Sequence, residues 1–262
     1  MARFPAGSVP NYAAWGPDGS LYVTDYAKPI VWRLAPGGGD PQPWLTDPHL
    51  DGGPVGTTGV ALAPDRSTLI VGQQSEAGLG AGDPATGRLL KVAIGADGKP
   101  GALTQLWESR PADGPDGFAI AQSGAIYVAL LVANQIAVIG PDGSERERFP
   151  AGPRGANDSA VPFDAPSSVR FLGTRLIVAN QSYFTGDATH QAILDVEAGE
   201  PGLPELIPPA PVRSRPRRRR STSRASTASG GGTTTAGAAS RRLFGAPRPT
   251  IARAGSSCGS PA

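Results

Sequence analysis

The stretch "ADGPDGFAIAQSGAIYVAL", from Ala112 to Leu130, decides the fold class of this chain. A short apolar run is followed by a Gly-containing turn and then by an alternating aliphatic and aromatic run. This is the pattern of two strands joined by a tight turn. The segment "VPNYAAWGPDGSLYVTDY", from Val9 to Tyr26, repeats it. We therefore expect a β-hairpin at each place.

Two more copies of the hairpin pattern are "TTGVALAPDRSTLIVGQQ", from Thr57, and "PSSVRFLGTRLIVANQS", from Pro166. Their hydrophobic triplets, which begin at Leu21, Leu69, Ile126 and Leu176, recur about every 50 residues, a period typical of propeller blades. A third apolar segment follows each hairpin, within 30–36, 88–94, 135–144 and 191–199. Each repeat thus supplies three strands and a loop that can hold an outer fourth, so the sequence predicts an all-β, propeller-like repeat protein.

The composition agrees with this fold class. The 262 residues include 36 Gly and 28 Pro, which suits a chain that turns every few residues and disfavours a helical protein. An immunoglobulin-like sandwich also has short strands and many turns, but it does not repeat one pattern at this spacing.

The net charge of +2 conceals two unlike segments. Residues 209–262 contain 11 Arg and no Lys, Asp or Glu, whereas residues 1–208 carry all 22 acidic residues and are net negative. The basic segment lacks apolar periodicity and is rich in Arg, Ser, Gly and Pro, a composition that buries too little surface to offset the entropy of ordering. We predict a partial propeller over 1–208 and a disordered tail over 209–262.

Two interpretations of the tail remain open. The run Arg217–Arg220 could bind polyanions, but a single aromatic residue, Phe244, offers no platform for bases, so specific nucleic-acid recognition is not expected. Alternatively, this Lys-free composition is what a GC-rich reading frame yields when it is translated out of register. The one cysteine, Cys258, also lies here, so residues 1–208 can form neither a disulfide nor a thiolate metal site.

No segment has the apolar core of a signal peptide or the ~20 apolar residues of a membrane helix. As encoded, the chain is expected to be soluble and cytoplasmic.

One polar residue precedes the inner strand of each repeat: Asn11, Thr58, Asp116 and Ser167. In a propeller this position faces the central channel, where ligands bind. All four side chains carry oxygen, which suits a hard cation such as Ca²⁺ provided that enough carboxylate charge is present.

These residues carry a resemblance to a known family. The phrases "PDGFAIAQSGAIYVAL", "GPDGSLYVTDY", "VALAPDRSTLIV" and "ILDVEAGEPGLP" resemble the senescence marker protein, gluconolactonase and luciferin-regenerating enzyme family, over roughly residues 9–207. The resemblance implies a six-bladed propeller with a divalent metal in its channel that hydrolyses lactones. Strictosidine-synthase-like and NHL-type propellers share the turn and strand motifs.

The resemblance implies that Asp116, in Pro115-Asp116-Gly117, is a metal ligand and handles a proton. The family has Glu where this chain has Asn11 and Asn where it has Thr58, so two of three ligands are altered and cation affinity should fall. Four repeats instead of six suggest a truncated member. Its open sheet edges would favour self-association, and its relatives include exported proteins.

Other interpretations stay open. Pro-Asp-Gly is also ordinary turn chemistry, as at Asp18 and Asp142. Ser167 and Asn180 are candidates for substrate binding, and His49 and His190 are expected to be exposed loop residues. The function is either metal-assisted hydrolysis of a small lactone or the binding of a small ligand or protein partner without turnover.

Overall fold

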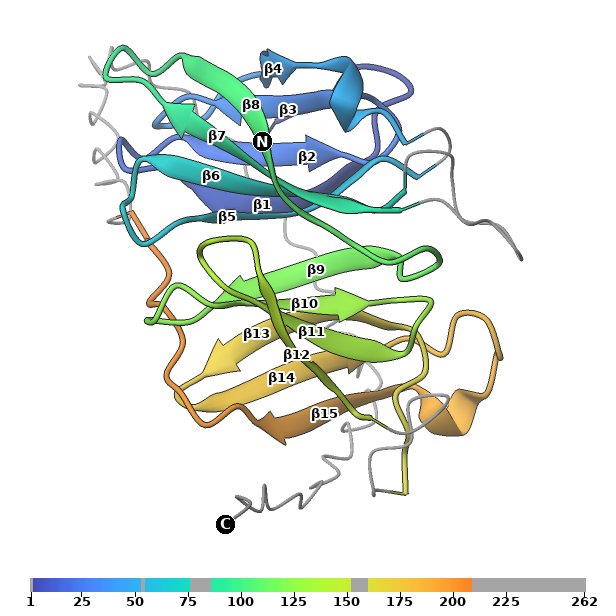
Figure 1. Cartoon of the computed structure of the whole chain (residues 1–262). Coiled ribbons are helices and arrows are strands. Elements are labelled where there is room, and N and C mark those ends of the chain that lie inside the picture. Colours follow the sequence, from blue (N-terminus) through green and yellow to red (C-terminus); the bar gives the residue numbers. More distant parts are fainter. Residues whose placement is uncertain (1, 53–54, 76–85, 152–159, 209–262) are drawn as a thin grey trace, which may run out of the picture. The chain divides into compact units, whose positions relative to one another are not determined.

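Four antiparallel sheets follow one another along the chain in the computed structural model (Figure 1), which describes residues 2–52, 55–75, 86–151 and 160–208. All these residues belong to one compact unit. The first sheet contains β1 (Pro10–Trp15), β2 (Leu21–Asp25), β3 (Ile30–Leu34) and β4 (Gln42–Thr46). The second contains β5 (Thr57–Leu62), β6 (Thr68–Gln73), β7 (Arg88–Ile94) and β8 (Pro100–Glu108).

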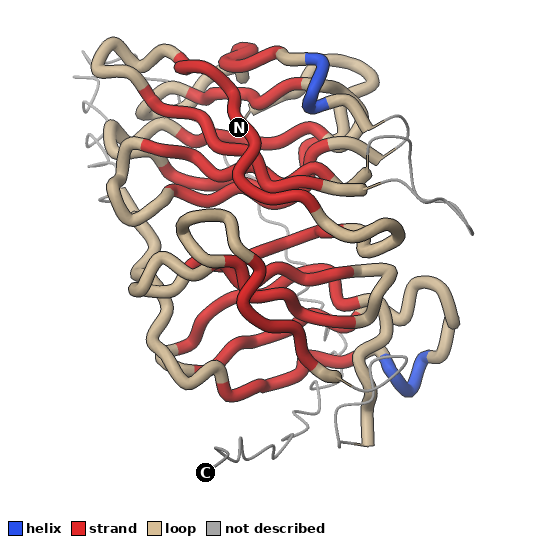
Figure 2. Tube along the Cα trace, in the orientation of Figure 1, coloured by secondary structure: helices blue, strands red, loops and turns tan. Residues whose placement is uncertain are grey.

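The third sheet contains β9 (Pro115–Ile120), β10 (Ile126–Leu130), β11 (Gln135–Ile139) and β12 (Glu145–Phe149). The fourth has three strands among the described residues, β13 (Pro166–Leu172), β14 (Arg175–Asn180) and β15 (Ala192–Glu197). In each sheet the strands lie in chain order, which is the meander of a propeller blade. Figure 2 shows that the only helical segments of the described residues are two short 3-10 turns, η1 (Pro48–Leu50) and η3 (Ala188–His190).

The blades pack through apolar side chains that alternate along their strands. Strand β1 contacts β5, β5 contacts β9, and β9 contacts β13, so the first strand of every blade lies on the inside. One cluster, which includes Tyr22 and Leu69, fills the space between blades one and two; another, with Ile70 and Val128, lies between blades two and three. A third cluster around Leu176 joins blades three and four.

The predicted propeller architecture is therefore confirmed, including the outer fourth strand of blades one to three. The residues after β15 return to blade three, where Leu203 N donates to Ile120 O at 2.8 Å and Gln122 N to Pro201 O at 2.9 Å. The predicted basic tail, 209–262, lies outside the described residues. In the part of the chain that the structure describes, no helix is both long and apolar enough to cross a membrane.

The three Pro-Asp-Gly tripeptides adopt two different structures. Gly19 and Gly143 have φ of 82° and 84° and close tight hairpin turns, where a residue with a Cβ would be strained. Asp116 and Gly117 instead lie within β9. The same three letters thus form a turn twice and the start of an inner strand once.

Candidate functional site

A β-bulge opens the inner hairpin of every blade at the same place. In blade one the register passes from Pro10↔Asp25 to Ala13↔Val23, so Asn11 and Tyr12 together oppose Thr24. The corresponding irregularities follow Thr57, Pro115 and Pro166 in the other blades. A bulge re-aims side chains and ends regular pairing, and it is often found beside functional sites.

The four bulges place the predicted channel residues at equivalent positions: Asn11, Thr58, Asp116 and Ser167. All of them lie where the inner strands begin, which is the right-hand side of Figure 1, opposite the arrowheads of β9 and β13. This end of the inner strands is called the channel mouth below. Thr58 and Ser167 are buried, Asp116 is partly accessible and Asn11 is exposed.

Asp116 carries the most perturbed carboxylate of the channel mouth. Desolvation raises its pKa to about 7, and only the Tyr12 hydroxyl, as a hydrogen-bond donor, opposes this rise. No Lys or Arg among the described residues is ion-paired with it. A desolvated acid with a pKa near neutrality and no cationic partner is typical of functional sites.

Tyr12 links blade one to blades three and four. Its hydroxyl donates to Ser167 O at 2.9 Å and is hydrogen-bonded to Ser168 Oγ. Burial first, and the charge of Asp116 second, raise the pKa of Tyr12, so the phenol stays protonated at neutral pH. The phenol therefore remains a hydrogen-bond donor, and its proton goes to Ser167 O.

Gly117 makes the approach of Tyr12 possible. A Cβ at Gly117 would lie 2.4 Å from the Tyr12 hydroxyl and 2.8 Å from Ser167 O. A Cβ at Gly59, the equivalent bulge position of blade two, would lie 3.0 Å from Asp116 O. Both glycines are needed for close packing around Asp116 and not for an unusual φ.

Tyr26 adds a second phenol to the channel mouth. It follows β2 directly, and its hydroxyl donates to Gln74 Oε1, at 2.5 Å. Burial, with the charges of Asp116 and Tyr183 as smaller causes, raises the pKa of Tyr26 to about 12. Tyr12 and Tyr26 were not among the residues predicted from the sequence.

The remaining predicted residues differ in what they contact. Thr58 Oγ1 donates to Pro115 O at 3.4 Å, next to Asp116, and Ser167 Oγ donates to Ala179 O at 3.4 Å. No hydrogen bond within the described residues joins the Asn11 side chain to Asp116. The predicted roles of Asn11 and Thr58 in metal binding and of Ser167 in substrate binding remain predictions.

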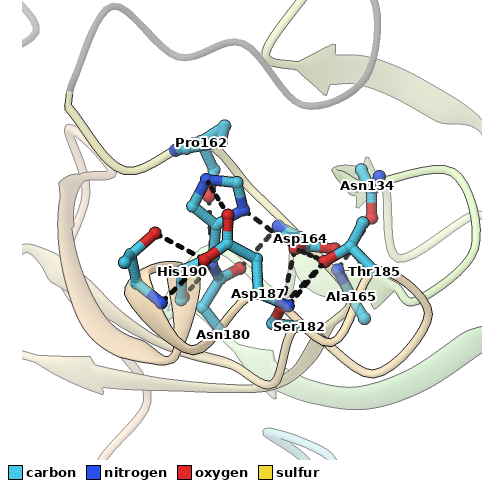
Figure 3. Close-up of polar contacts among 10 residues, drawn as sticks. Asn134, Pro162, Asp164, Ala165, Asn180, Ser182, Thr185, Asp187 and His190 are labelled. Atoms are coloured by element: carbon cyan, nitrogen blue, oxygen red, sulfur yellow. Dashed lines mark hydrogen bonds and ion pairs between the residues drawn. The ribbon is translucent and has the colours of Figure 1, made fainter.

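Asn180 belongs to a separate polar cluster around Asp164 (Figure 3). It accepts from Asp164 N at 2.8 Å and donates to His190 O at 2.8 Å and Pro162 O at 3.0 Å. His190 Nδ1 lies 3.0 Å from Asp164 Oδ2, and the imidazole is 27% exposed. The expectation of an exposed loop residue is correct for His49, which is 68% exposed, and wrong for His190. The role of Asn180 toward a substrate remains a prediction.

A cavity lies at the opposite end of the inner strands. It has a volume of about 760 Å³ and is lined by Trp15, Leu62, Ile120, Phe171 and Leu203, among others. Its size suits a small ligand. The carboxylate in its wall, Glu205, is ion-paired with Arg170, so the cavity offers weaker acid–base chemistry than the channel mouth.

The residues of the channel mouth fit a divalent cation in donor type but offer little charge. Carboxylate, hydroxyl and amide oxygens are the ligands that hard cations prefer. A desolvated carboxylate without a positive neighbour also gains from a bound cation. However, no cluster of three or more His, Cys, Asp or Glu side chains suited to a metal occurs in the described part of the chain.

No protein-family model and no curated protein matches the chain. Among solved structures, regucalcin from Agrobacterium tumefaciens, described as a calcium-binding protein, is 18% identical with a TM-score of 0.54, over 77% of this chain and 65% of its own. A protein described as a gluconolactonase is 20% identical with a TM-score of 0.51, over 75% of this chain and 60% of its own. The chain thus spans about 60–65% of the length of these proteins. The resemblance inferred from the sequence is confirmed at the level of the fold: the chain has the propeller fold of the gluconolactonase and regucalcin structures.

Proposed function

We propose that the channel mouth is the active site of a hydrolase that opens small lactones, with Asp116 as its proton acceptor. The observation that carries this proposal is the desolvated Asp116 carboxylate, whose pKa is raised to about 7. A general base is most effective when its pKa lies close to the working pH. The solved gluconolactonase propeller, which shares this fold, suggests the substrate class.

In this mechanism Asp116 takes a proton from water as the water oxygen attacks the lactone carbonyl carbon. The bond between that carbon and the ring oxygen then breaks, and the proton passes from Asp116 to the ring oxygen, which leaves an open hydroxy acid. Tyr12 keeps its proton at neutral pH, and its hydroxyl partly opposes the effect of burial on the pKa of Asp116. Gly117 leaves the space that the Tyr12 hydroxyl requires.

A divalent cation would be held by Asp116 together with the oxygens of Thr58 and Asn11. When bound, such a cation polarises the carbonyl of the substrate. The single carboxylate predicts weak affinity, because fewer negative ligands stabilise the ion less.

The test compares Asp116→Asn with Asp142→Asn in the full chain. Asp142 lies in another Pro-Asp-Gly tripeptide, in an exposed turn, where its carboxylate accepts hydrogen bonds from Ser144 N and Oγ. The rate of ring opening of glucono-δ-lactone is measured from the acid that the reaction releases, with and without Ca²⁺. We expect Asp116→Asn to lose about 10²–10⁴-fold in rate and Asp142→Asn to match the wild type. Equal rates in all three proteins would reject Asp116 as the base.

A binding module without turnover is the second candidate function, and the low charge of the metal ligands favours it. Here a small ligand would occupy the channel mouth and remain unchanged. Calorimetry with a lactone would then give a finite binding heat, and the lactone would be recovered intact. Recovery of the hydroxy acid at a rate above the uncatalysed one would exclude this candidate.

A further inference from the structure

The loop between β14 and β15 carries two aromatic side chains that the reaction above does not use. Tyr183 is 72% exposed and Phe184 is 54% exposed. Their rings pack edge to face, with centroids 5.2 Å apart and an interplanar angle of 86°. Two adjacent large aromatic side chains held in solvent form a surface on which a ligand can stack.

A buried carboxylate holds this loop in place. Asp164 is 4% exposed, and Figure 3 shows Ser182, Thr185 and His190 converging on it. Ser182 Oγ donates to Asp164 Oδ2 at 2.9 Å and Ser182 N to Asp164 O at 2.7 Å, while the Thr185 hydroxyl donates to the same carboxylate. Burial alone would raise the pKa of Asp164, but these bonds and the one to His190 outweigh it and lower the pKa.

The backbone of the loop is fixed as closely as its side chains. Gly186 N donates to Ser182 O at 2.9 Å, and these two residues have φ of 68° and 53°. The aromatic residues lie between them, at the tip of the turn. Because the conformation is set before a ligand arrives, little ordering entropy remains to be lost on binding.

The tip lies at the channel mouth. The loop follows β14 at the end where the inner strands begin, just as Tyr26 follows β2. Tyr26 and the tip therefore lie at the same end of the blades as Asp116. The acidic side chains Asp116 and Asp187 disfavour an anionic ligand.

We propose that Tyr183 and Phe184 form an aromatic platform that stacks against a planar ring fused to a neutral lactone, and so select the substrate of the channel mouth. This inference rests on the proposed lactone hydrolysis for the identity of the ligand. Asp164 acts as the positioning residue of the platform. The preferred substrates are then lactones fused to a benzene ring.

The experiment measures binding without turnover. Dihydroquinolinone and piperidinone are lactams that resist hydrolysis and differ only by the fused benzene ring. Calorimetry with the full chain should show tighter binding of dihydroquinolinone. The double variant Tyr183→Ala/Phe184→Ala should lose about three- to tenfold in its affinity for dihydroquinolinone and keep its affinity for piperidinone.

Two further variants separate stacking from other effects. Tyr183→Phe retains the ring and should bind dihydroquinolinone as the wild type does. Leu172→Ala removes another exposed side chain, 69% exposed, at the opposite end of the same blade and should change nothing. Unchanged binding in the double variant, or a wild type with no preference for dihydroquinolinone, would overturn the platform. Selective binding of the lactam without hydrolysis of any lactone would leave the platform standing and reject the proposed reaction.

Discussion

At the scale of single residues, Asp116 makes stability depend on pH. Its folded pKa of about 7 lies above the usual value of 3.8, so the folded state binds the proton more tightly than the unfolded state. This contribution to stability is complete below about pH 4 and is lost as the pH rises through 7. Each unit by which the folded pKa exceeds the unfolded pKa corresponds to about 1.4 kcal/mol of the free energy of unfolding. Without divalent cations, we expect Asp116→Asn to melt at a higher temperature than the wild type at pH 8.

A bound cation should reverse the order of the two melting temperatures, so that the wild type melts above Asp116→Asn. Calcium that binds the ionised Asp116 raises the melting temperature of the wild type by mass action and leaves Asp116→Asn unchanged. Thermal scans at pH 4.5 and pH 8, with and without Ca²⁺, measure both effects. A wild type and variant with the same pH profile would show that Asp116 is well hydrated in the folded state.

The sequence predicted Asp116 but not its partner Tyr12. Alignment of the repeats identifies the first bulge residue of each blade, because it precedes an apolar run. Tyr12 is the second bulge residue, and its equivalents are Gly59 and Gly117. The available signal was a tyrosine at a repeat position that two other blades fill with glycine. The direction of the Tyr12 side chain across the channel depends on packing between blades, which no local sequence pattern encodes.

At the scale of elements, an ion pair fixes the outermost strand of blade three. Arg148 in β12 contacts both oxygens of Asp113, at 2.7 and 2.6 Å, in the loop that leads into β9. The two side chains are 9% and 5% exposed. The nearby carboxylates raise the pKa of Arg148 against the effect of burial, so the guanidinium remains charged.

Removal of Asp113 should be costly, because the buried guanidinium of Arg148 loses two charged hydrogen bonds and keeps those to Glu145. We expect Asp113→Ala to lower the free energy of unfolding by about 1.5–3 kcal/mol. The exposed pair of Arg170 and Glu205, 48% and 60% exposed, provides the control. Glu205→Ala should cost about 0–1 kcal/mol. Urea denaturation compares the two variants, and equal losses would contradict the distinction by burial.

The inner hairpins were predictable and the outer strands much less so, for one physical reason. All five residues of β10 are buried, so its apolar run is strong in the sequence. Strand β12, Glu-Arg-Glu-Arg-Phe, has two exposed and three partly buried residues and shows only a charge pattern in the sequence. Its ion pair with Asp113 spans 35 residues and cannot be read from local sequence.

At the scale of the whole described unit, self-association remains a prediction, and a sheet face can mediate it as well as a strand edge. Blades one and four stand at the two ends of the described series of blades, so each has one face that no consecutive blade covers. On blade four the side chains that face blade three, such as Val178 and Leu194, are buried. Ile193, next to Leu194 in β15, lies on the opposite face of the sheet and is 54% exposed. On blade one the corresponding face is partly covered, because Phe4 packs edge to face on Trp32 with centroids 6.0 Å apart.

The uncovered face of blade four therefore predicts association between copies of the chain. Ile193 lies opposite Ala179, so this part of the face is apolar, and a second copy would remove it from water. We expect Ile193→Lys to shift the sedimentation distribution toward the monomer, because a charge on this face must be desolvated on contact. Leu172→Lys introduces the same charge at an exposed position at the end of β13 and should leave the distribution unchanged. A wild type that stays monomeric at all concentrations would show that the face is already protected, and an equal shift in both variants would indicate a general effect of charge.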